Sequence, residues 1–237
     1  MVDLVIATRN RHKVRELKQL LNVRGIRWHS LVEFPHVAAV DETGRTFDAN
    51  AIKKACAVAA ATGHLALADD SGLEVEALGG APGVRSARFA GRHGNDRANN
   101  ERLLHLLKET PARQRRARYQ CSLALAGASP SRLLALTHGT WSGVIDHVPR
   151  GRNGFGYDPI FLVPRLGKTV GQLSIRLKHR LSHRAQAARR MQRVLARLVA
   201  RAPATGRRRG GFAASRLARG RMDQRDRRTA WQRASAR

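Results

Sequence analysis

The sequence contains few acidic residues and few cysteines. Its 237 residues include 17 aspartates and glutamates against 45 lysines and arginines, which gives a formal net charge of +28 at pH 7. A basic surplus of this size is typical of proteins with phosphate-rich partners, namely nucleotides, nucleic acids or anionic membranes. Only two cysteines are present, Cys56 and Cys121, so a disulfide scaffold or a cysteine-based zinc site is not expected. Both lie in apolar runs and are predicted to be small core residues.

Long hydrophobic runs are also absent. No apolar run approaches the roughly 20 residues that a membrane-spanning helix needs. The N-terminus, MVDLVIAT, lacks the basic start of a secretory signal peptide. We therefore expect a cytoplasmic protein that makes no contact with a membrane. A chain of this length can bury the core of one large domain.

The basic residues are unevenly distributed along the chain. Residues 201–237 hold twelve arginines and two aspartates, so about +10 of the net charge lies there. Arginine, glycine, alanine and serine dominate this end with little periodicity. We therefore predict a disordered tail, 201–237, after a folded domain that spans 1–200. Such a tail could be a solvated extension without a function, or it could contact nucleic acid without sequence preference.

Hydrophobic periodicity predicts alternating strands and helices, followed by a hairpin. Asn10 is a suitable N-cap for the first helix, and Gly63 is a suitable stop for the second. Early alternation followed by paired strands favours an α/β or an α+β fold with a central mixed β-sheet flanked by helices. The predicted strands span 4–8, 65–68, 117–126 and 133–141, and the predicted helices span 11–23, 47–62, 96–108 and 181–201.

A polar turn joins the first strand to the first helix. It reads Thr8-Arg9-Asn10-Arg11-His12-Lys13. Helix N-termini present free backbone N–H groups and a partial positive charge, which suits phosphate. The turn lacks the glycines of a Walker A loop, and an ordinary capped turn with solvated basic residues has the same composition.

The segment Asp69-Asp70-Ser71-Gly72 is predicted to end the strand at 65–68. Successive side chains of a strand point to opposite faces, so one carboxylate is expected to face inward. A buried carboxylate needs a cation or hydrogen-bond donors, and Mg²⁺ takes carboxylate and phosphate oxygens together. One carboxylate of the pair could hold the metal or orient a water for attack on phosphorus. A turn built on Asp and Ser remains an alternative, and the second acidic pair, Asp41-Glu42, could be solvated loop residues.

Two further clusters carry groups that suit a nucleotide. Phe155 and Tyr157 lie in the glycine-rich segment 151–159 and could stack on a base, and Asp158 could accept a hydrogen bond from a base or ribose. Lys178 suits a phosphate, and the donors of Ser182-His183-Arg184 suit a purine keto oxygen. A hairpin turn with packed aromatics and a solvated basic face are the alternatives for these two clusters.

In chain order, these blocks resemble the inosine/xanthosine triphosphate pyrophosphatases, which remove non-standard purine nucleotides from the nucleotide pool. The resemblance covers residues 2 to about 199, and the ordered set of blocks is far more specific than any single one. The blocks are Ala7-Thr8 with Asn10 and Lys13, Thr43-Gly44 with Thr46-Phe47, Asn50-Ala51 with Lys54-Ala55, Leu67 to Leu73, Gly79 to Val84 with Ser86-Ala87-Arg88, Gly154 to Pro159, and Ser182-His183-Arg184.

The resemblance implies an α/β fold with two lobes, a cleft between them and a homodimer. It implies Mg²⁺-dependent hydrolysis of ITP, dITP and XTP to the monophosphate and pyrophosphate. Asp70 would be catalytic, near the metal, with Asp41 and Glu42 as further acidic ligands. The resemblance implies that the triphosphate is held by Thr8, Arg9, Asn10, Arg11, His12, Lys13 and Lys178. Ser71 would also contact the substrate. The base pocket would be lined by Phe155, Gly156, Tyr157 and Asp158, and the 6-keto group would be contacted by His183 and Arg184.

Four positions depart from the family pattern. Ala49 stands where the family usually has glutamate, Gly171-Gln172 stand where Ala-Glu is common, and Arg9 stands where glycine is frequent. Two lost acids near a metal site would weaken metal binding or turnover. A second function therefore remains open, in which the pyrophosphatase core is degenerate and the protein binds nucleic acid through its arginine-rich tail. A pyrophosphatase for modified pyrimidines is the third reading, which Ser182-His183-Arg184 argues against.

Overall fold

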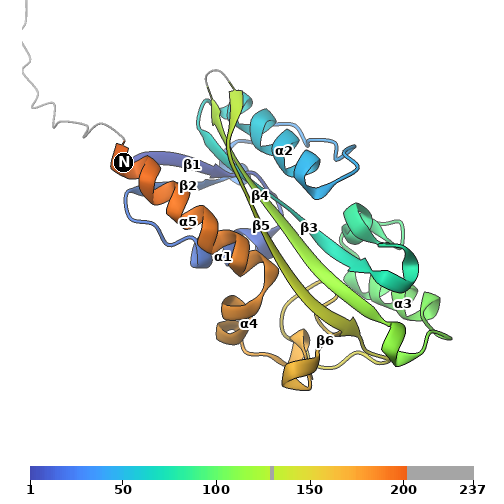
Figure 1. Ribbon diagram of the computed structural model, residues 1–237. Coiled ribbons are helices and arrows are strands. Elements are labelled where there is room, and N and C mark those ends of the chain that lie inside the picture. The colour runs from blue at the N-terminus through green and yellow to red at the C-terminus, as the bar shows by residue number, and fades with distance from the viewer. Residues whose placement is uncertain (129–130, 202–237) are drawn as a thin grey trace, which may run out of the picture. The chain divides into compact units, whose positions relative to one another are not determined.

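A single mixed sheet of seven strands organises the chain (Figure 1). The computed structural model describes residues 1–128 and 131–201, and the strand order is β2-β1-β3-β4-β5-β6-β7. β1 pairs in parallel with β2 and β3, and every later pair is antiparallel, so the predicted mixed sheet is confirmed. The strands are β1 Val2–Ile6, β2 Ile26–Ser30, β3 Leu65–Val75, β4 Arg116–Ala128, β5 Ser131–Ile145, β6 Phe161–Val163 and β7 Lys168–Thr169.

Helices cover both faces of the first part of the sheet. Along β1, Leu4 and Ile6 join a core under α1 and α5, whereas Val5 and Ala7 join a core under α2. This alternation follows from the two-residue period of a strand. The helices are α1 Arg11–Leu20, α2 Phe47–Thr62, α3 Asp96–Leu106, α4 Ile175–Leu181 and α5 His183–Arg201.

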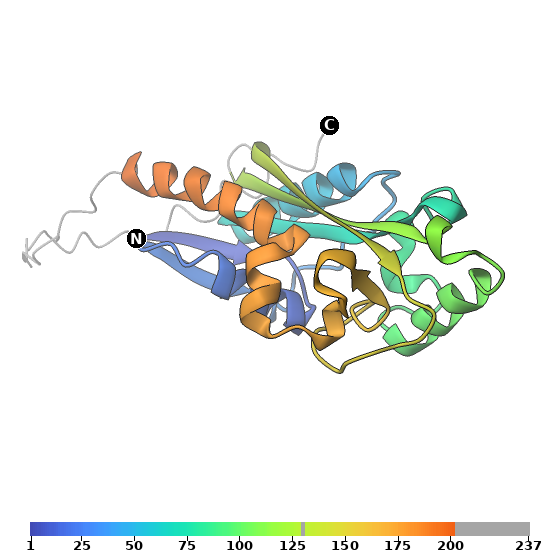
Figure 2. The same ribbon diagram turned by 60° about the horizontal axis from the view of Figure 1, so that its bottom comes forward.

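A third core forms where β3, β4 and β5 extend beyond the first two strands. Leu73, Leu103, Tyr119 and Phe161 are buried members of this core, which joins α3 and β6 to the sheet. Figures 1 and 2 show the long strands β4 and β5 running from one group of helices to the other. Residues 1–201 therefore form two lobes that share the long central strands.

The caps that the sequence predicts are present. The Asn10 side chain accepts hydrogen bonds from the backbone N–H groups of His12 and Lys13 at the start of α1. Gly63 ends α2 in the left-handed conformation, with φ of 69°. Both ends match the stereochemical preference of the residue that occupies them.

Several sequence predictions need correction. β3 does not end at residue 68 but continues to Val75 through both aspartates. The last helix is preceded by a separate short helix, α4, and β2, β6 and β7 were not predicted. Cys121 is buried as expected, but Cys56 is only half-buried at the edge of the core under α2.

Two other sequence predictions concern chain ends and membranes. The tail proposed for 201–237 lies, apart from Arg201, outside the described residues, as does the middle of the turn between β4 and β5. Within 1–128 and 131–201, no helix is long and apolar enough to cross a membrane.

Candidate active site

The two adjacent aspartates of β3 point to opposite faces of the sheet. Asp69 faces α1 and α5, and Asp70 faces α2, as the strand period requires. Both are buried, with exposed fractions of 1% and 5%. Their surroundings differ, because Asp69 is fully paired with cations whereas Asp70 is not.

Asp69 lies at the centre of an ion-pair network between the sheet and two helices. One carboxylate oxygen lies 2.5 Å from Lys13 Nζ, and the other accepts from Arg184 Nε at 2.9 Å. Ser71 Oγ donates to Asp69 at 2.9 Å and accepts from Arg184 Nη2 at 2.8 Å. Burial alone would raise the pKa of Asp69, but Arg184 and Lys13 outweigh it and hold the pKa well below its usual range.

Glu16 extends this network from α1. Its carboxylate pairs with Arg184 at 2.6 Å and with Lys178 at 2.8 Å, and all three side chains are buried. Lys178 also pairs with Asp158 at 2.8 Å. Three cations, Lys13, Lys178 and Arg184, thus balance three buried carboxylates, and breaking one pair would leave an uncompensated buried charge.

Asp70 is held more loosely, in a group that faces α2. Lys54 Nζ lies 3.4 Å from Asp70 Oδ1 and 2.9 Å from Glu42 Oε1, and it donates to the backbone carbonyl of Asp69 at 2.9 Å. Arg88 approaches the other oxygen of Glu42 at 3.4 Å. Asp70 Oδ2 is buried and has no hydrogen-bond partner among the described residues. Burial raises the pKa of Asp70, and Lys54 only partly offsets this effect.

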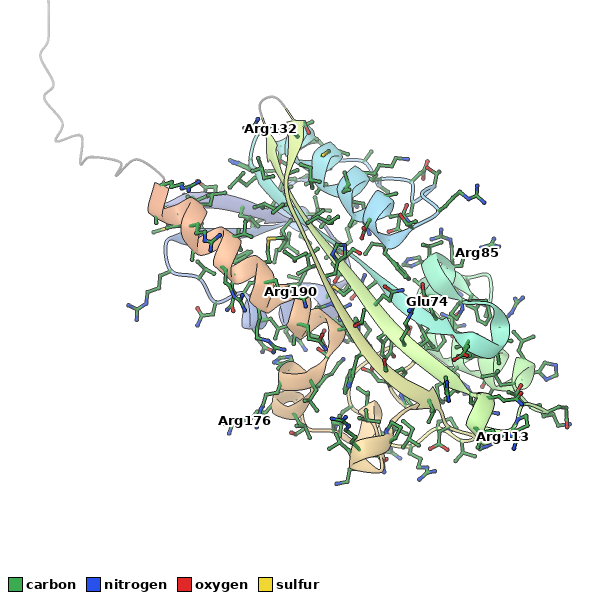
Figure 3. All side chains as sticks on the ribbon, viewed as in Figure 1. Glu74, Arg85, Arg113, Arg132, Arg176 and Arg190 are labelled. Atoms are coloured by element: carbon green, nitrogen blue, oxygen red, sulfur yellow. The ribbon has the colours of Figure 1, made fainter. Side chains whose placement is uncertain are left out.

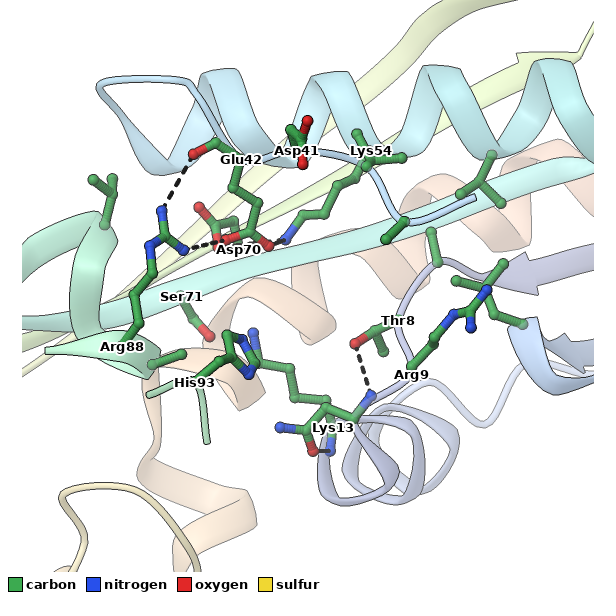
Figure 4. Close-up of a pocket in the computed structure, with 18 of the residues that line it drawn as sticks. Thr8, Arg9, Lys13, Asp41, Glu42, Lys54, Asp70, Ser71, Arg88 and His93 are labelled. Atoms are coloured by element: carbon green, nitrogen blue, oxygen red, sulfur yellow. Dashed lines mark hydrogen bonds and ion pairs between the residues drawn. The ribbon is translucent and has the colours of Figure 1, made fainter. Parts of the chain in front are cut away.

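A cavity of about 580 Å³ opens beside Asp70. Figure 4 shows Asp70, Glu42 and Lys54 on one wall, Thr8, Arg9 and Lys13 on another, and Arg88 with His93 on a third. Thr8 Oγ1 accepts a hydrogen bond from the N–H of Asn10, which fixes the turn that opens α1. The cavity thus combines three carboxylates, including the exposed Asp41, with four basic side chains, Arg9, Lys13, Lys54 and Arg88.

A smaller cavity of about 110 Å³ lies between the glycine-rich loop and α5. Asn10, Lys13, Ser71 and His93 line both cavities, so the two are neighbours. The further residues of the smaller cavity include Tyr119, Phe155, Gly156, Tyr157, Asp158, Lys178, His183 and Arg184.

Aromatic and charged groups alternate in the smaller cavity. Phe155 packs on His12 with ring centroids 5.4 Å apart, and Lys178 Nζ lies 4.6 Å from the centroid of the same ring. His183 stacks on Tyr119 at 4.5 Å, and its buried Nδ1 has no partner within the described part of the chain. Burial holds the pKa of His183 well below its usual range, so the ring is neutral at pH 7.

The glycine-rich loop supplies Asp158. Its carboxylate accepts from Lys178, from the Tyr119 hydroxyl at 3.2 Å and from the N–H of Phe155 at 2.9 Å. A Cβ at Gly154 would lie 1.9 Å from Asp158 Oδ2, and Gly154 has φ of +80°, so only glycine fits there. The loop therefore folds tightly around this carboxylate.

Some predicted site residues lie elsewhere or do something else. Arg11 and His12 line neither cavity, although His12 stacks on Phe155, and Arg9 donates to the carbonyl of Val37 at 2.7 Å. Lys178, predicted to hold the triphosphate, instead lines the smaller cavity, where Glu16 and Asp158 neutralise it. The nitrogens of Arg184 already donate to Asp69, Glu16 and Ser71.

The two positions where acids are missing relative to the family pattern line neither cavity. Ala49 is exposed in the first turn of α2. Gln172 caps a short 3₁₀ helix, where its Oε1 accepts from the N–H of Thr169 at 2.9 Å. The acids that do reach the larger cavity are Asp41, Glu42 and Asp70.

Sequence reasoning assigned no role to several residues that the structure brings to the site. Lys54 and Arg88 were visible only as members of motif blocks, and Glu16 reads as an ordinary surface charge of a helix. Tyr119 sits in the middle of an apolar strand pattern, and His93 lies in a loop without a recognisable motif. These five side chains come together at the site only because the folded chain brings α2, α5 and the loop before α3 close to one another.

Comparisons with known proteins find similar sequences over most of the chain. A model of the Ham1 family matches residues 4–194. A protein named dITP/XTP pyrophosphatase from Desulforamulus reducens is 49% identical over 178 residues, which span 75% of this chain and 88% of that protein. Another with the same name from Exiguobacterium sp. is 51% identical over 174 residues, 73% of this chain and 86% of that protein.

Solved structures are similar over the same region. A HAM1 protein from Coxiella burnetii superposes with a TM-score of 0.76 at 41% identity, covering 83% of this chain and all of that chain. The crystal structure of a nucleoside-triphosphatase / dITP/XTP pyrophosphatase from Mycobacterium abscessus gives a TM-score of 0.65 at 38% identity, covering 84% and 98%.

Proposed function

This chain belongs to the Ham1 family, and from that premise we propose that it hydrolyses ITP, dITP and XTP to the monophosphate and pyrophosphate. The observation that carries the proposal is the buried, unpartnered Oδ2 of Asp70 beside a cavity lined with cations. A buried carboxylate oxygen without a partner is costly, and a ligand that meets it recovers that cost. A water or a metal ion between Asp70 and a phosphate fits this position.

The larger cavity is suited to the phosphate chain. Lys13, Lys54 and Arg88 approach it from three elements, and the N-terminus of α1 adds the positive end of its dipole. Each of the three cations is already paired with a carboxylate, and the negative charge of that carboxylate weakens the attraction of the cation for a triphosphate. Additional positive charge is therefore needed to hold a triphosphate beside Glu42 and Asp70.

Mg²⁺ would supply that charge, and the donor set fits it. No group of three or more His, Cys, Asp or Glu side chains that could hold a metal occurs among the described residues. Magnesium does not require such a group, because it is commonly bound through one or two carboxylates plus phosphates and waters. Asp70 and Glu42 would be those carboxylates, and the exposed Asp41 could hold a bound water. When bound, the ion would neutralise charge on the phosphates and polarise their oxygens.

Asp70 would act as the general base in the proposed reaction. A water oxygen forms a bond to the α-phosphorus, and the bond from that phosphorus to the oxygen bridging the α- and β-phosphates breaks. Pyrophosphate leaves with the electron pair, and the proton of the attacking water passes to Asp70 Oδ2. A raised pKa suits this task because it makes the carboxylate a better proton acceptor near neutral pH.

The smaller cavity would take the base. His183 is neutral with a ring nitrogen free of partners in the described chain, so it can meet the 6-keto oxygen of hypoxanthine or xanthine. Adenine carries an amine at that position, which would leave the buried donor unpaired. Such mismatches discriminate strongly between otherwise similar ligands.

Three further features belong to the proposal and rest on the resemblance and the composition. The protein would act as a homodimer in the cytoplasm. The arginines of 202–237 could contact nucleic acid without sequence preference. The alternative of a nucleic-acid-binding protein on a dead core is disfavoured because Asp70, Lys54, Glu42 and Lys13 all reach the cavity.

Hydrolysis in water labelled with ¹⁸O tests the reaction. Attack at the α-phosphorus places the label in the monophosphate, and phosphorus NMR of the products would detect it there. Label in the pyrophosphate would mean attack at the β-phosphorus, and release of inorganic phosphate would mean attack at the γ-phosphorus. Either result contradicts the proposed step.

A further inference from the structure

One side of the molecule carries exposed cations and no exposed acid. It is formed by α1, α4 and α5, and α5 packs against both of the other helices (Figure 1). The only acid in these three helices is Glu16, which is buried under Lys178 and Arg184. We call the exposed cations of these helices the basic face: Arg11, Arg15, Lys18, Arg176, Arg180, Arg189, Arg190, Arg193, Arg197 and Arg201.

The basic face forms no ion pair within the described chain, and only Lys18 is near enough to an acid, Glu33, to lower the pKa of its carboxyl. No member of it lies within ion-pair distance of a carboxylate in 1–128 or 131–201. Two of its members bind carbonyl oxygens instead: Arg189 donates to Arg180 at 3.1 Å and Arg190 donates to His138 at 2.6 Å. The sequence explains this, because no aspartate or glutamate occurs between Asp158 and Asp223.

Some exposed arginines elsewhere in the molecule are paired with acids. Arg97 pairs with Glu101 at 2.8 Å, Arg118 with Glu74 at 2.6 Å, and Arg150 with Asp146 at 2.8 Å. Figure 3 shows Arg176 and Arg190 on α4 and α5, and Glu74 over the other lobe. Others, such as Arg85, Arg113 and Arg116, form no ion pair with the described chain, so the basic face is distinguished by the gathering of its cations on three adjoining helices.

Five of the arginines form a stripe along α5. At 100° per residue, positions 189, 190, 193, 197 and 201 fall within an arc of about 120° on the helix surface. Positions 189, 193, 197 and 201 follow one another at intervals of four residues, about 6 Å of helix rise each, so the stripe is about 18 Å long. A DNA strand carries one phosphate per about 3.4 Å of axis, so about five phosphates of one strand span the same length.

A membrane surface is a poorer match than nucleic acid. A helix that binds in the lipid interface inserts large apolar side chains on its free face. The apolar side chains of α5, Met191 and Leu195 among them, are buried against the sheet. Of the large hydrophobic residues exposed in the described chain, only Ile175 lies on these three helices. The face offers charge without an apolar anchor.

We propose that the basic face of α1, α4 and α5 binds the phosphate backbone of nucleic acid without sequence preference. The partner is defined by charge complementarity, since a row of unpaired guanidinium groups suits a row of phosphates. The surface is separate from both cavities, apart from the N-terminal end of α1, so binding there would leave hydrolysis unaffected. The proposal does not depend on the identity of the substrate.

The test compares two full-length triple variants by fluorescence anisotropy with a labelled 25-base-pair DNA duplex of arbitrary sequence. The first is Arg193→Gln, Arg197→Gln, Arg201→Gln on α5. The matched control is Arg85→Gln, Arg113→Gln, Arg116→Gln, three exposed arginines of the other lobe. Glutamine and arginine have similar helix propensities, and both variants lose the same charge and keep 202–237, so tail binding is common to both.

The expected result is a loss of affinity of about tenfold for the α5 variant at 100 mM salt. Each phosphate contact contributes about 0.9 to the slope of log K against log salt, so the slope should become shallower by about two to three. The control should retain the wild-type slope within about one. Equal losses in the two variants, or no loss in either, would overturn the proposal, as would binding to anionic phosphatidylglycerol vesicles but not to DNA. Hydrolysis of ITP by both variants reports that the fold is intact.

Discussion

Asp69 and Asp70 are adjacent in the sequence, but their side chains have different partners in the site. Asp69 is paired with Lys13 and Arg184, and its pKa is held well below the usual range. Asp70 keeps one oxygen free of partners in the described chain, and its pKa is raised. Under the proposed mechanism, the same residue type would serve as a structural anchor on one face of β3 and as the general base on the other.

Asp70→Asn should abolish hydrolysis and leave a slightly more stable protein. Loss of a general base costs about 10²–10⁴-fold in rate. Because the folded-state pKa of Asp70 is raised, folding is favoured below the ordinary aspartate pKa and this stability is lost as pH rises through the raised value. At pH 7 the buried charge of Asp70 therefore destabilises the folded protein, and the substitution by asparagine removes that charge. Thermal unfolding should show a Tm higher by a few degrees, and a lower Tm or turnover within tenfold of wild type would contradict this role.

Asp69→Asn should have the opposite effect on stability. It would leave Lys13 and Arg184 without their shared carboxylate, and breaking a buried pair costs about 3–5 kcal/mol. Because the pKa of Asp69 is lowered in the folded state, its contribution is present above the ordinary aspartate pKa and is lost as pH falls through the folded value. Urea unfolding measures the change.

Asp41→Asn is the control for this measurement, because Asp41 is exposed and its side chain makes no hydrogen bond or ion pair with the described chain. It should change the free energy of unfolding by less than about 0.5 kcal/mol. Equal effects of the two substitutions would remove the structural role assigned to Asp69.

Among the elements, those with strong local signals were predictable from the sequence. Asn10 and Gly63 mark helix ends through their own stereochemistry, and the α/β class follows from the order of the periodic segments. β3 was predicted too short because Asp-Asp-Ser-Gly has the composition of a turn. The strand continues because Lys13, Lys54 and Arg184, from three different helices, reach its two carboxylates. Such long-range neutralisation has no local signature.

The same limit applies to the site. The motif blocks identified Asp70, the turn before α1 and the glycine-rich loop, and the structure brings all three to adjoining cavities. Glu16 could not be recognised, since a glutamate between Arg15 and Leu17 in a helix is normally solvated. Its burial depends on α4 and α5 bringing Lys178 and Arg184 onto α1. The ion pairs of Lys178 could not be predicted for the same reason, because its two carboxylate partners are 20 and 162 residues away in sequence.

The contact of α5 with β5 predicts the effect of a change far from the chemistry. A Cβ at Gly139 would lie 2.0 Å from the carbonyl oxygen of His183, which is backbone and cannot yield without moving the start of α5. Gly139→Ala should therefore cost about 1–3 kcal/mol of stability. It should also raise KM for ITP, because His183 and Arg184 move with the helix.

Gly127→Ala is the matched control on the neighbouring strand. There the added Cβ would meet Leu134 at 3.5 Å, an ordinary contact, so stability and KM should stay near wild type. If Gly139→Ala behaved in the same way, the close contact between α5 and β5 would not position the base pocket.

At the scale of the whole molecule, two lobes share long strands and place an acidic wall opposite basic ones. The cations at the larger cavity are paired with carboxylates, whereas those of the basic face are not. Under the proposed mechanism, this difference separates a site that would need a metal to bind phosphate from a surface that would bind phosphate unaided. Excess EDTA should therefore abolish hydrolysis without weakening DNA binding in the anisotropy assay. Loss of both activities, or of neither, would contradict that separation.

The central claim is tested most directly by pyrophosphate release from ITP, XTP, dITP, ATP and GTP, with Mg²⁺ or EDTA, for the wild type and Asp70→Asn. We predict metal-dependent release from ITP, dITP and XTP at kcat/KM values at least about 100-fold above ATP and GTP, and none above background from the variant. Release from ATP at a comparable rate would contradict the assignment of the smaller cavity to 6-keto purines. A folded wild-type protein that releases no pyrophosphate from any of the five nucleotides would contradict the proposed function.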